Sequence, residues 1–456
     1  MLNLDLTTIA QITTGRLHGR DVRITEVSTD SRQSSRDALF VALRGENHDA
    51  HDFVEAAKSQ GACAALVERQ LDIELPQVIV ADSQIALGQL AGHVRREREL
   101  CVIGITGSNG KTTVKTLLAG ILGLHAPTHF SVGSFNNEIG LPLTLLATPE
   151  DAQFVVLEMG AGKPGDIAYL VQIALPQIGL VNNIAPAHLE RMGSLEGVAS
   201  TKGALYSGLP AHGIAVINAD DTFAPFFIEL ASGRTLIRFG LGEGAEVTAR
   251  FTPTGPDSEF TLVTPIGEIE ISTPLLGLHN VLNALAASSL ALAVDVPLAT
   301  IKAGLEGASA VSGRSARRLH SSGATIIDDT YNANPASFSA AINTLAACTG
   351  TRILVVGDMR ELGPDGERLH AETGALALNK GIDRLYAVGD LSRAAAQAFG
   401  NEARYFENQE SLIRALEEEL KPDATLLVKG SRGSAMDRVV RALFGDEIVQ
   451  GDRHVA

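Results

Sequence analysis

The sequence predicts an α/β protein of three domains, because its length, its short apolar runs and its glycines all favour that architecture. At 456 residues the chain is long enough for roughly three domains of about 150 residues each. Short apolar runs alternate with segments of helical periodicity, which is typical of parallel sheets covered by helices. The 45 glycines outnumber the 17 prolines, and glycine serves where a backbone turns sharply or approaches a ligand closely.

The first predicted domain, residues 1–98, is a small N-terminal α/β unit. It alternates apolar runs with helical patterns and ends in a fully polar segment, which favours a domain boundary there. Its predicted elements are strands at 38–43 and 77–80, a helix at 53–60, and a helix that Asp82 and Ser83 cap and that ends at 95–99.

In the second predicted domain, residues 99–312, a buried strand leads into a glycine-rich turn and then a helix with one apolar face. Further short apolar runs separated by helix-length segments predict a P-loop ATPase-like parallel sheet. The predicted elements are strands at 101–105, 154–157 and 178–181, antiparallel strands between 250 and 271, and a closing helix at 279–292.

The third predicted domain, residues 313–456, is Rossmann-like, with a doubly wound sheet. Each of its apolar runs, at 353–356, 385–388 and 426–428, is followed by a glycine-containing turn and a helical pattern. The acidic run from Glu417 to Glu419 is expected on a solvated helix face, without a function.

The charge balance argues against nucleic acid as a partner. The chain has 37 basic and 53 acidic side chains, a net charge of −16, no Trp and 4% aromatic residues. General nucleic-acid binding needs a basic surface and usually stacking aromatic rings. Any anionic ligand must therefore be held by local features of the fold.

The cysteines and the apolar segments favour the cytoplasm. Cys63, Cys101 and Cys348 are far apart and form no pattern typical of zinc sites or disulfide frameworks. The first residues do not resemble a signal peptide, and no apolar run reaches the roughly 18 residues of a membrane span. We therefore expect a cytoplasmic protein with no membrane insertion.

A phosphate-binding loop is predicted at residues 107–113, Gly-Ser-Asn-Gly-Lys-Thr-Thr, between a buried strand and a helix. Glycine lets backbone N–H groups wrap a phosphate, Lys111 can neutralise its oxygens, and the hydroxyl of Thr112 can ligate Mg²⁺. The loop is a variant, because Ile105 stands where the usual pattern has its first glycine. The alternative interpretation is a glycine-rich turn that caps an ordinary helix.

Three further residues are candidates for the chemistry. Glu158 follows a buried strand, where an acid would meet the Mg²⁺ of a nucleotide, while His188 and Lys202 come after the next strand. Taken singly, each is better explained without a function, Glu158 as a helix-capping acid, His188 as a loop histidine and Lys202 as a surface lysine.

Together these segments resemble the ATP-dependent Mur ligases of peptidoglycan synthesis. The similar segments follow the family's order along the chain, and the flanking units match its N- and C-terminal domains. They are residues 107–113, 136–142 (Asn-Asn-Glu-Ile-Gly-Leu-Pro), 158–161, 188–190, 277–284 (Gly-Leu-His-Asn-Val-Leu-Asn-Ala), 313–314 and 329–335 (Asp-Thr-Tyr-Asn-Ala-Asn-Pro).

Within that family the similarity is greatest to the member that adds D-alanyl-D-alanine to UDP-N-acetylmuramoyl-tripeptide. The Asp-Asn-Pro-Arg box of the diaminopimelate-adding relative is absent, and Pro186 and Arg191 stand where relatives often carry small residues. The distinguishing segments are residues 29–32, 48–53, 331–335, 357–363 and 429–433.

The resemblance implies a nucleotide site and a metal site. Thr112 and Glu158 would hold one Mg²⁺ and His188 a second, with Lys202 carbamylated to support it. Lys111, Glu158, His188 and Lys202 would be catalytic. ATP would contact Gly107, Ser108, Asn109, Gly110, Lys111, Thr112 and Thr113, with Asn280 and Asn283 at the adenine, Arg314 at a phosphate and Asp329 at the ribose.

The same resemblance implies the substrate contacts and a domain movement. The third domain would bind D-alanyl-D-alanine and close on the nucleotide, and we expect a monomer. UDP would contact Thr29, Ser31, Gly45, Glu46, Asn47 and His48; the peptide substrates would contact Asn136, Asn137, Tyr331, Asn332 and Asn334.

Two other functions stay open at this point. One is a related carboxylate-amine ligase, such as a folylpolyglutamate synthetase-like enzyme or a Mur ligase that adds a single amino acid. The other is a nucleotide-binding regulatory module without catalysis. Segment 29–32 argues against the folate-like enzyme, since it would be idle without a UDP substrate, and the joint presence of Lys111, Glu158, His188 and Lys202 argues against the regulatory module. The third residue of the tripeptide, diaminopimelate or lysine, is left undetermined.

Overall fold

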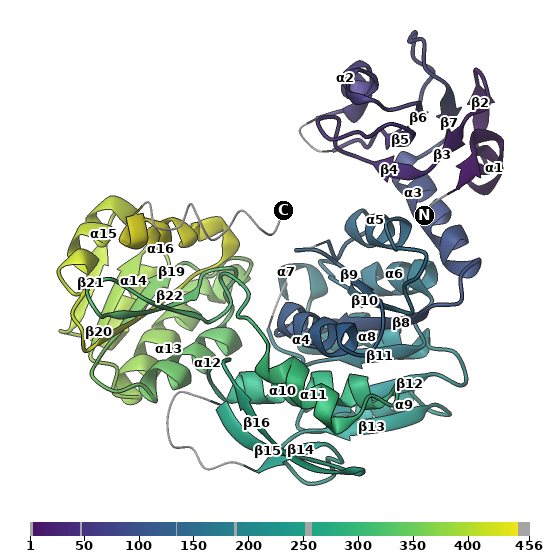
Figure 1. Ribbon diagram of the computed structural model, residues 1–456. Coiled ribbons are helices and arrows are strands. Elements are labelled where there is room, and N and C mark those ends of the chain that lie inside the picture. Colours follow the sequence, from purple (N-terminus) through teal and green to yellow (C-terminus); the bar gives the residue numbers. More distant parts are fainter. Residues whose placement is uncertain (1–2, 46–47, 134, 187–188, 251–257, 446–456) are drawn as a thin grey trace.

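The computed structural model describes residues 3–45, 48–133, 135–186, 189–250 and 258–445. Figure 1 shows an N-terminal domain at one end, a central domain beside it, and a C-terminal domain on the other side of the central domain. The predicted α/β class with three domains is confirmed, and two six-stranded sheets, one fully and one mainly parallel, dominate the molecule. No helix in the described ranges is long and apolar enough to cross a membrane.

The N-terminal domain is built on a five-stranded sheet of order β2-β7-β6-β5-β4, in which only the β2–β7 pair is antiparallel. Helix α3 starts where Asp82 accepts a hydrogen bond from the N–H of Ile85 (2.9 Å), as the sequence predicts. The elements are β1 (Leu4–Asp5), α1 (Leu6–Ile12), β2 (Arg16–His18), β3 (Arg23–Ile24), β4 (Glu26–Ser28), β5 (Ala38–Val41), η1 (Ala50–Phe53), α2 (Val54–Gln60), β6 (Ala64–Val67), β7 (Gln77–Ile79) and α3 (Ser83–Arg96).

The central domain contains a fully parallel sheet of order β13-β12-β11-β8-β10-β9, and helices cover both of its faces. Alternate residues of β8 enter different cores: Val102 packs with α3, α5 and α6, whereas Ile103 packs with α4, α10 and α11. The elements are β8 (Cys101–Thr106), α4 (Lys111–Gly123), β9 (Thr128–Phe130), α5 (Gly140–Leu146), β10 (Phe154–Glu158), α6 (Asp166–Ala174), β11 (Ile178–Val181), α7 (Leu189–Met192), α8 (Leu195–Ser207), β12 (Ile214–Asn218), α9 (Ala224–Leu230) and β13 (Thr235–Phe239).

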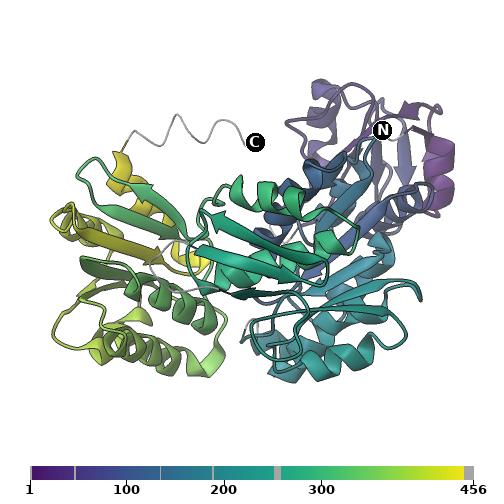
Figure 2. The same ribbon diagram turned by 60° about the horizontal axis from the view of Figure 1, so that its bottom comes forward.

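A three-stranded antiparallel sheet, predicted from the alternating pattern of its residues, completes the central domain. It packs on α10 and α11, and in Figure 2 these elements lie in the middle of the view, beside the C-terminal domain. The elements are β14 (Thr248–Arg250), β15 (Ser258–Thr264), β16 (Gly267–Thr273), α10 (Leu278–Leu292) and α11 (Leu298–Glu306).

The C-terminal domain has a six-stranded sheet of order β17-β18-β22-β19-β20-β21, with only β17 antiparallel. Helices α12, α13 and α14 cover one face, while α15 and α16 cover the other. The elements are β17 (Ala316–Leu319), β18 (Thr325–Asp329), α12 (Pro335–Ala346), β19 (Thr351–Gly357), η2 (Gly363–Asp365), α13 (Gly366–Asn379), β20 (Arg384–Val388), α14 (Ser392–Phe399), β21 (Ala403–Phe406), α15 (Gln409–Glu417), β22 (Ala424–Lys429), η3 (Arg432–Ser434) and α16 (Asp437–Phe444).

One prediction about this domain holds only in part. Glu417 ends α15 and Glu418 is its C-cap, and both are exposed, but Glu419 lies beyond the helix. Glu419 is instead partly buried, where it accepts hydrogen bonds from the hydroxyl of Tyr386 (2.8 Å) and from Arg384. The last acid of the run lies inward here because a buried hydroxyl and a guanidinium satisfy its charge.

Candidate active site

A cavity of about 1130 Å³ lies between the central and C-terminal domains. Its lining residues come from segments that follow β8, β10 and β11 in one sheet and β18, β19 and β22 in the other. The carboxyl ends of two parallel sheets therefore meet at one cavity. Ligands of open α/β sheets bind in such a crevice, where the strand order reverses.

The phosphate-binding loop after β8 takes a shape that only glycine adopts without strain. Gly107 and Gly110 have φ angles of +146° and +80°, and α4 begins directly after them at Lys111. A Cβ atom on Gly110 would lie 2.3 Å from Oδ1 of Asn283 and 2.4 Å from Nδ2 of Asn182. The loop is thus closely packed around a helix N-terminus, which favours bound anions.

Two asparagines after β11 hold this loop in place. The side chain of Asn183 accepts a hydrogen bond from the backbone N–H of Asn109 (2.9 Å) and donates one to its carbonyl oxygen (3.1 Å). Asn182 donates both to that carbonyl and to Oδ1 of Asn283, each over 3.0 Å. Sequence reasoning missed this pair, although both residues directly follow a buried strand at the carboxyl edge of the sheet.

Lys111 folds over the loop that precedes it. Its Nζ donates to the carbonyl oxygens of Gly107 (2.7 Å) and Ser108 (3.4 Å). Burial lowers the pKa of Lys111, with attraction from Glu158 opposing the shift and repulsion from Arg314 adding to it. The ammonium therefore lies in the loop, as the predicted role in charge neutralisation requires.

Glu158, the last residue of β10, is surrounded by donors and cations. Its carboxylate accepts hydrogen bonds from the hydroxyl of Thr112 (2.7 Å) and from Nδ2 of Asn136 (2.8 Å). Nζ of Lys115 lies 3.5 Å from it, and both side chains are 2% exposed. Burial works to raise the pKa of Glu158, but Lys111, Lys115 and the two hydrogen bonds hold it below its usual value.

The buried Lys115 is a second residue that sequence reasoning missed. It lies on the apolar face of α4, one turn after Lys111, and also donates to the carbonyl of Gly133 (2.9 Å). A lysine among apolar positions of a helix is a signal that could have revealed it, because a buried cation needs a partner.

Lys202 on α8 is buried and lines the cavity. Burial and, to a lesser extent, repulsion from Lys111 lower the pKa of Lys202 to about 7. An amine with that pKa is largely uncharged in weakly alkaline solution. His188 lies outside the described residues, so its expected role beside Lys202 stays a prediction.

The predicted adenine contacts, Asn280 and Asn283, are buried on α10 and line the cavity. Nδ2 of Asn283 donates to Oδ1 of Asn280 (3.0 Å), and Nδ2 of Asn280 donates to the carbonyl of Leu276 (2.8 Å). Arg314, at the start of the C-terminal domain, places its guanidinium 4.0 Å from the centre of the Tyr331 ring. Its buried Nε has no hydrogen-bond partner in the described part of the chain.

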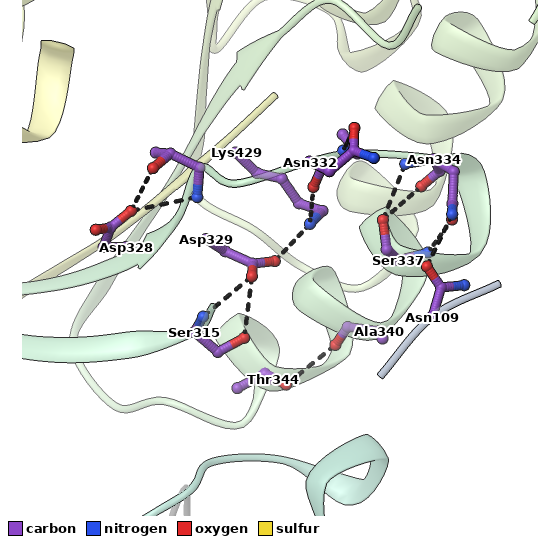
Figure 3. A network of polar contacts seen from close by, with 12 residues as sticks. Asn109, Ser315, Asp328, Asp329, Asn332, Asn334, Ser337, Ala340, Thr344 and Lys429 are labelled. Carbon is purple, nitrogen blue, oxygen red and sulfur yellow. Dashed lines mark hydrogen bonds and ion pairs between the residues drawn. The ribbon is translucent and has the colours of Figure 1, made fainter. Parts of the chain in front are cut away.

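Asp329, the predicted ribose contact, is held by the protein itself, as Figure 3 shows. One carboxylate oxygen accepts from Nζ of the buried Lys429 (2.6 Å), and the other accepts from the backbone N–H of Ser315 (3.0 Å). Lys429 also donates to the carbonyl of Asn332 (3.0 Å). From the sequence, Lys429 stands out only as part of a distinguishing motif, not as a partner of Asp329.

The predicted substrate residues fall into two groups. Asn136, Asn137, Tyr331, Asn332 and Asn334 line the cavity. Thr29, Ser31, Gly45 and His48 belong to the N-terminal domain and are not part of the described lining. Glu46 and Asn47 lie outside the described residues.

The arrangement fits a Mg²⁺-nucleotide on the chemistry of its donors. No group of three or more His, Cys, Asp or Glu side chains that could hold a metal occurs in the described ranges. Mg²⁺ usually binds through one or two carboxylates together with phosphate oxygens and water. Thr112 and Glu158, 2.7 Å apart beside the phosphate-binding loop, supply that kind of partial site.

Comparisons with known proteins agree with the resemblance. Residues 105–291 match the Mur ligase middle domain, residues 313–432 the glutamate ligase domain of Mur ligases, and residues 23–98 the domain described as "Mur ligase family, catalytic domain". A UDP-N-acetylmuramoyl-tripeptide--D-alanyl-D-alanine ligase of Escherichia coli K12 is 43% identical over 447 residues, covering 97% of this chain and 99% of the relative.

Solved structures are similar over nearly the whole length. MurF from Acinetobacter baumannii superposes with a TM-score of 0.91 at 34% identity, covering 97% of this chain and 99% of that one. MurF ligase from Thermotoga maritima in complex with ADP gives a TM-score of 0.81 at 28% identity, covering 92% and 96% of the two chains. On this full-length similarity, the chain belongs to the Mur ligase family.

Proposed function

We propose that this protein is an ATP-dependent ligase that joins D-alanyl-D-alanine to UDP-N-acetylmuramoyl-tripeptide, giving the pentapeptide precursor of peptidoglycan. The observation that carries the proposal is the cavity between two sheet edges, which brings the phosphate-binding loop, Glu158 and Lys202 together with the C-terminal domain. The substrate assignment is supported by full-length similarity to ligases of that name.

The reaction solves a chemical problem. A carboxylate is a poor electrophile near neutral pH, so one of its oxygens must first become part of a leaving group. The terminal carboxylate of the tripeptide attacks the γ-phosphorus of ATP, the bond to ADP breaks, and an acyl phosphate forms. The amine of the dipeptide then attacks the acyl carbon, loses a proton and expels phosphate through a tetrahedral intermediate. Lys111 and the loop N–H groups offset charge on the transferring group.

Thr112 and Glu158 would hold Mg²⁺, which when bound neutralises phosphate charge during the transfer. The short contact between these two side chains and the low pKa of Glu158 support this assignment, because the carboxylate is ionised. A second Mg²⁺, with His188 and Lys202 as ligands, stays part of the proposal.

Carbamylation of Lys202 would remove the repulsion between an ammonium and the metal. An uncharged amine attacks CO₂ and releases one proton, so a pKa near 7 makes this lysine suited to the modification. We expect a carbamate ¹³C resonance in wild-type enzyme equilibrated with ¹³C-bicarbonate and none in Lys202→Ala. Near wild-type activity of Lys202→Ala without a short carboxylic acid would contradict the proposal.

The nucleotide would lie across both domains. Asn280 and Asn283 would contact adenine, Arg314 a phosphate and Asp329 the ribose. The buried, unpartnered Nε of Arg314 supports an anion there in the described part of the cavity. Asp329 would have to share its Ser315-bound oxygen with the ribose, because Lys429 occupies the other.

The remaining contacts follow the same division of the molecule. Thr29, Ser31 and residues 45–48 would bind UDP on the N-terminal domain, while Asn136, Asn137, Tyr331 and Asn332 would contact the peptide substrates. We propose that the enzyme works in the cytoplasm, because it needs ATP. We also propose that it is a monomer. A single elution volume matching one chain in size-exclusion chromatography is the expected result, and a dimer volume would contradict it.

Phosphate release from ATP tests the function directly. We expect release only when UDP-N-acetylmuramoyl-tripeptide and D-alanyl-D-alanine are both present, with D-alanine and glutamate inactive as amines. Turnover with glutamate would favour a folylpolyglutamate synthetase-like ligase. No turnover with any amine would favour a regulatory module. Parallel assays with diaminopimelate- and lysine-containing tripeptides identify the third residue.

A further inference from the structure

A side chain of the C-terminal domain reaches the phosphate-binding loop of the central domain. Asn334 precedes α12 and donates from its Nδ2 to Oδ1 of Asn109 over 2.8 Å, across 225 positions of sequence. Figure 3 shows this contact beside the group around Asp329 and Lys429. No other residue of the C-terminal domain forms a hydrogen bond to loop residues 107–113 in the described ranges.

The helix cap determines which end of the Asn334 amide faces the loop. Oδ1 of Asn334 accepts from the N–H of Ser337 (2.8 Å), and the hydroxyl of Ser337 accepts from the N–H of Asn334 (2.9 Å). This reciprocal capping box uses the amide oxygen, so the amide nitrogen points at Asn109. Both polar ends of the side chain are engaged by the protein, which argues against the substrate contact expected from the sequence.

On the other side, Asn109 is already fixed through its backbone. Its N–H and carbonyl are bonded to Asn183, and its carbonyl also to Asn182. The side chain of Asn109 is therefore available for the hydrogen bond to Asn334, while its backbone bonds hold the loop in place. The contact joins the element that would receive phosphate to the first residue before α12.

We propose that Asn334 is a positioning residue that presets the phosphate-binding loop through Asn109, so that the loop binds the nucleotide most tightly when the two domains are docked. The proposal rests on the proposed function only in taking the ligand to be an adenine nucleotide. Asn334 need not touch the reacting atoms; it acts by reducing the conformations that the loop must give up on binding.

Asn334→Ser separates this role from helix capping. Serine is also a favoured N-cap residue, but its hydroxyl is too short to bridge to Asn109 and is occupied by the cap. Asn408→Ser is the control for helix capping, because the side chain of Asn408 also accepts the N–H of the third residue of its helix, Ser411 (2.9 Å), although without the reciprocal bond, and is not part of the described cavity lining.

We expect Asn334→Ser to weaken ADP binding, measured by calorimetry, by about fivefold, the effect of one neutral hydrogen bond. KM for ATP should rise similarly while kcat changes less than twofold. Asn109→Ala should weaken ADP binding as much, and the double variant no more than either single one. Asn408→Ser should leave ADP affinity unchanged and match the melting temperature of Asn334→Ser.

Additive effects in the double variant, or equal ADP affinities of Asn334→Ser and wild type, would overturn the proposal. These outcomes are distinguishable from failure of the proposed function, because ADP affinity is measured without tripeptide or amine. If the proposed amine substrate is incorrect, the ADP-binding measurements still test the coupling between Asn109 and Asn334.

Discussion

At Glu158 a single buried carboxylate balances several cations. Thr112 and Asn136 donate to it, Lys115 lies 3.5 Å away, and Lys111 also attracts the carboxylate. The local charge is therefore positive although the chain carries a net charge of −16. Such a site suits a triphosphate and Mg²⁺, because the protein supplies the compensating charge before the ligand arrives.

Glu158→Gln should raise the Mg²⁺ concentration for half-maximal ATP turnover by about tenfold or more and lower kcat by roughly 10²-fold. The amide keeps the shape of the side chain but not its charge, so Lys115 loses its counter-ion. The measurement is a Mg²⁺ titration of phosphate release. Glu246→Gln, which removes a charge from the more exposed ion pair with Arg238, is the control and should change neither value.

Unchanged Mg²⁺ dependence in Glu158→Gln would remove Glu158 from the metal site.

The negative charge of Glu158 also makes the stability of the protein depend on pH. Because the pKa of Glu158 is lowered in the folded protein, its ionised carboxylate increases the free energy of unfolding at neutral pH, above the usual glutamate pKa. That contribution is lost as the pH falls through the lower, folded-state value.

Cys101 should react much more slowly with iodoacetamide than a free cysteine at pH 8. Burial raises its pKa to about 11, with the nearby Arg95 opposing the shift only in part. The reactive thiolate would then be about a hundredfold or more scarcer than for an ordinary thiol. Mass spectrometry of the alkylated peptide checks this, and labelling at the rate of free cysteine would contradict it.

At the scale of single residues, the sequence predicted functional side chains but not the distant residues that contact them. Lys111, Thr112 and Glu158 were found because a loop after a strand has a recognisable chemistry, and they do lie together. The sequence did not reveal the buried lysines that pair with the carboxylates of the site. Lys115 and Lys429 act through contacts with Glu158 and Asp329, residues 43 and 100 positions away, and such distances depend on strand order.

Among the elements, α4 and its loop depend most on backbone shape. Gly110 needs a positive φ and is flanked by Asn182 and Asn283, whereas Gly123 lies at the end of the same helix, where a Cβ would have no atom within 4 Å. These two glycines offer a matched pair, because the same substitution meets opposite environments within one element.

Gly110→Ala should weaken ADP binding by at least about tenfold and lower the free energy of unfolding by roughly 1–3 kcal/mol, from strain and displaced asparagines. Gly123→Ala should leave ADP binding unchanged and raise stability by up to about 1 kcal/mol. Calorimetry and urea unfolding provide the two readouts. Equal effects of both substitutions would show that Gly110 has no special place in the loop.

The sequence predicted the presence of helices and strands better than the residues at which they end. The periodicity of residues 101–123 predicted strand, loop and helix, and β8 and α4 occupy that stretch. Only Glu419, at the end of the acidic run, was misplaced, because local composition does not reveal that Tyr386 and Arg384, from a strand earlier in the chain, come to lie beside it. Non-local packing decides such termini.

Across the whole molecule, the chain passes between the two cavity-forming domains at a short strained segment. Gly313 and Ser315 have φ angles of +73° and +54°, and Asp328 and Asp329 accept their N–H groups at 3.2 and 3.0 Å. Arg314, between them, faces the cavity. A ligand that engages Arg314 and Asp329 would compete with the bonds that fix this segment, so nucleotide binding and domain position should be coupled.

We therefore expect the C-terminal domain to close further on the central one when the site is filled. In solution scattering the radius of gyration should fall on adding a non-hydrolysable ATP analogue with UDP-N-acetylmuramoyl-tripeptide and D-alanyl-D-alanine. Adenosine, which lacks the phosphates that Lys111 and Arg314 would bind, should leave it unchanged. Because the proposed contacts come from both domains, identical profiles with and without the full ligand set would mean that the described arrangement already is the working one, and closure would be rejected.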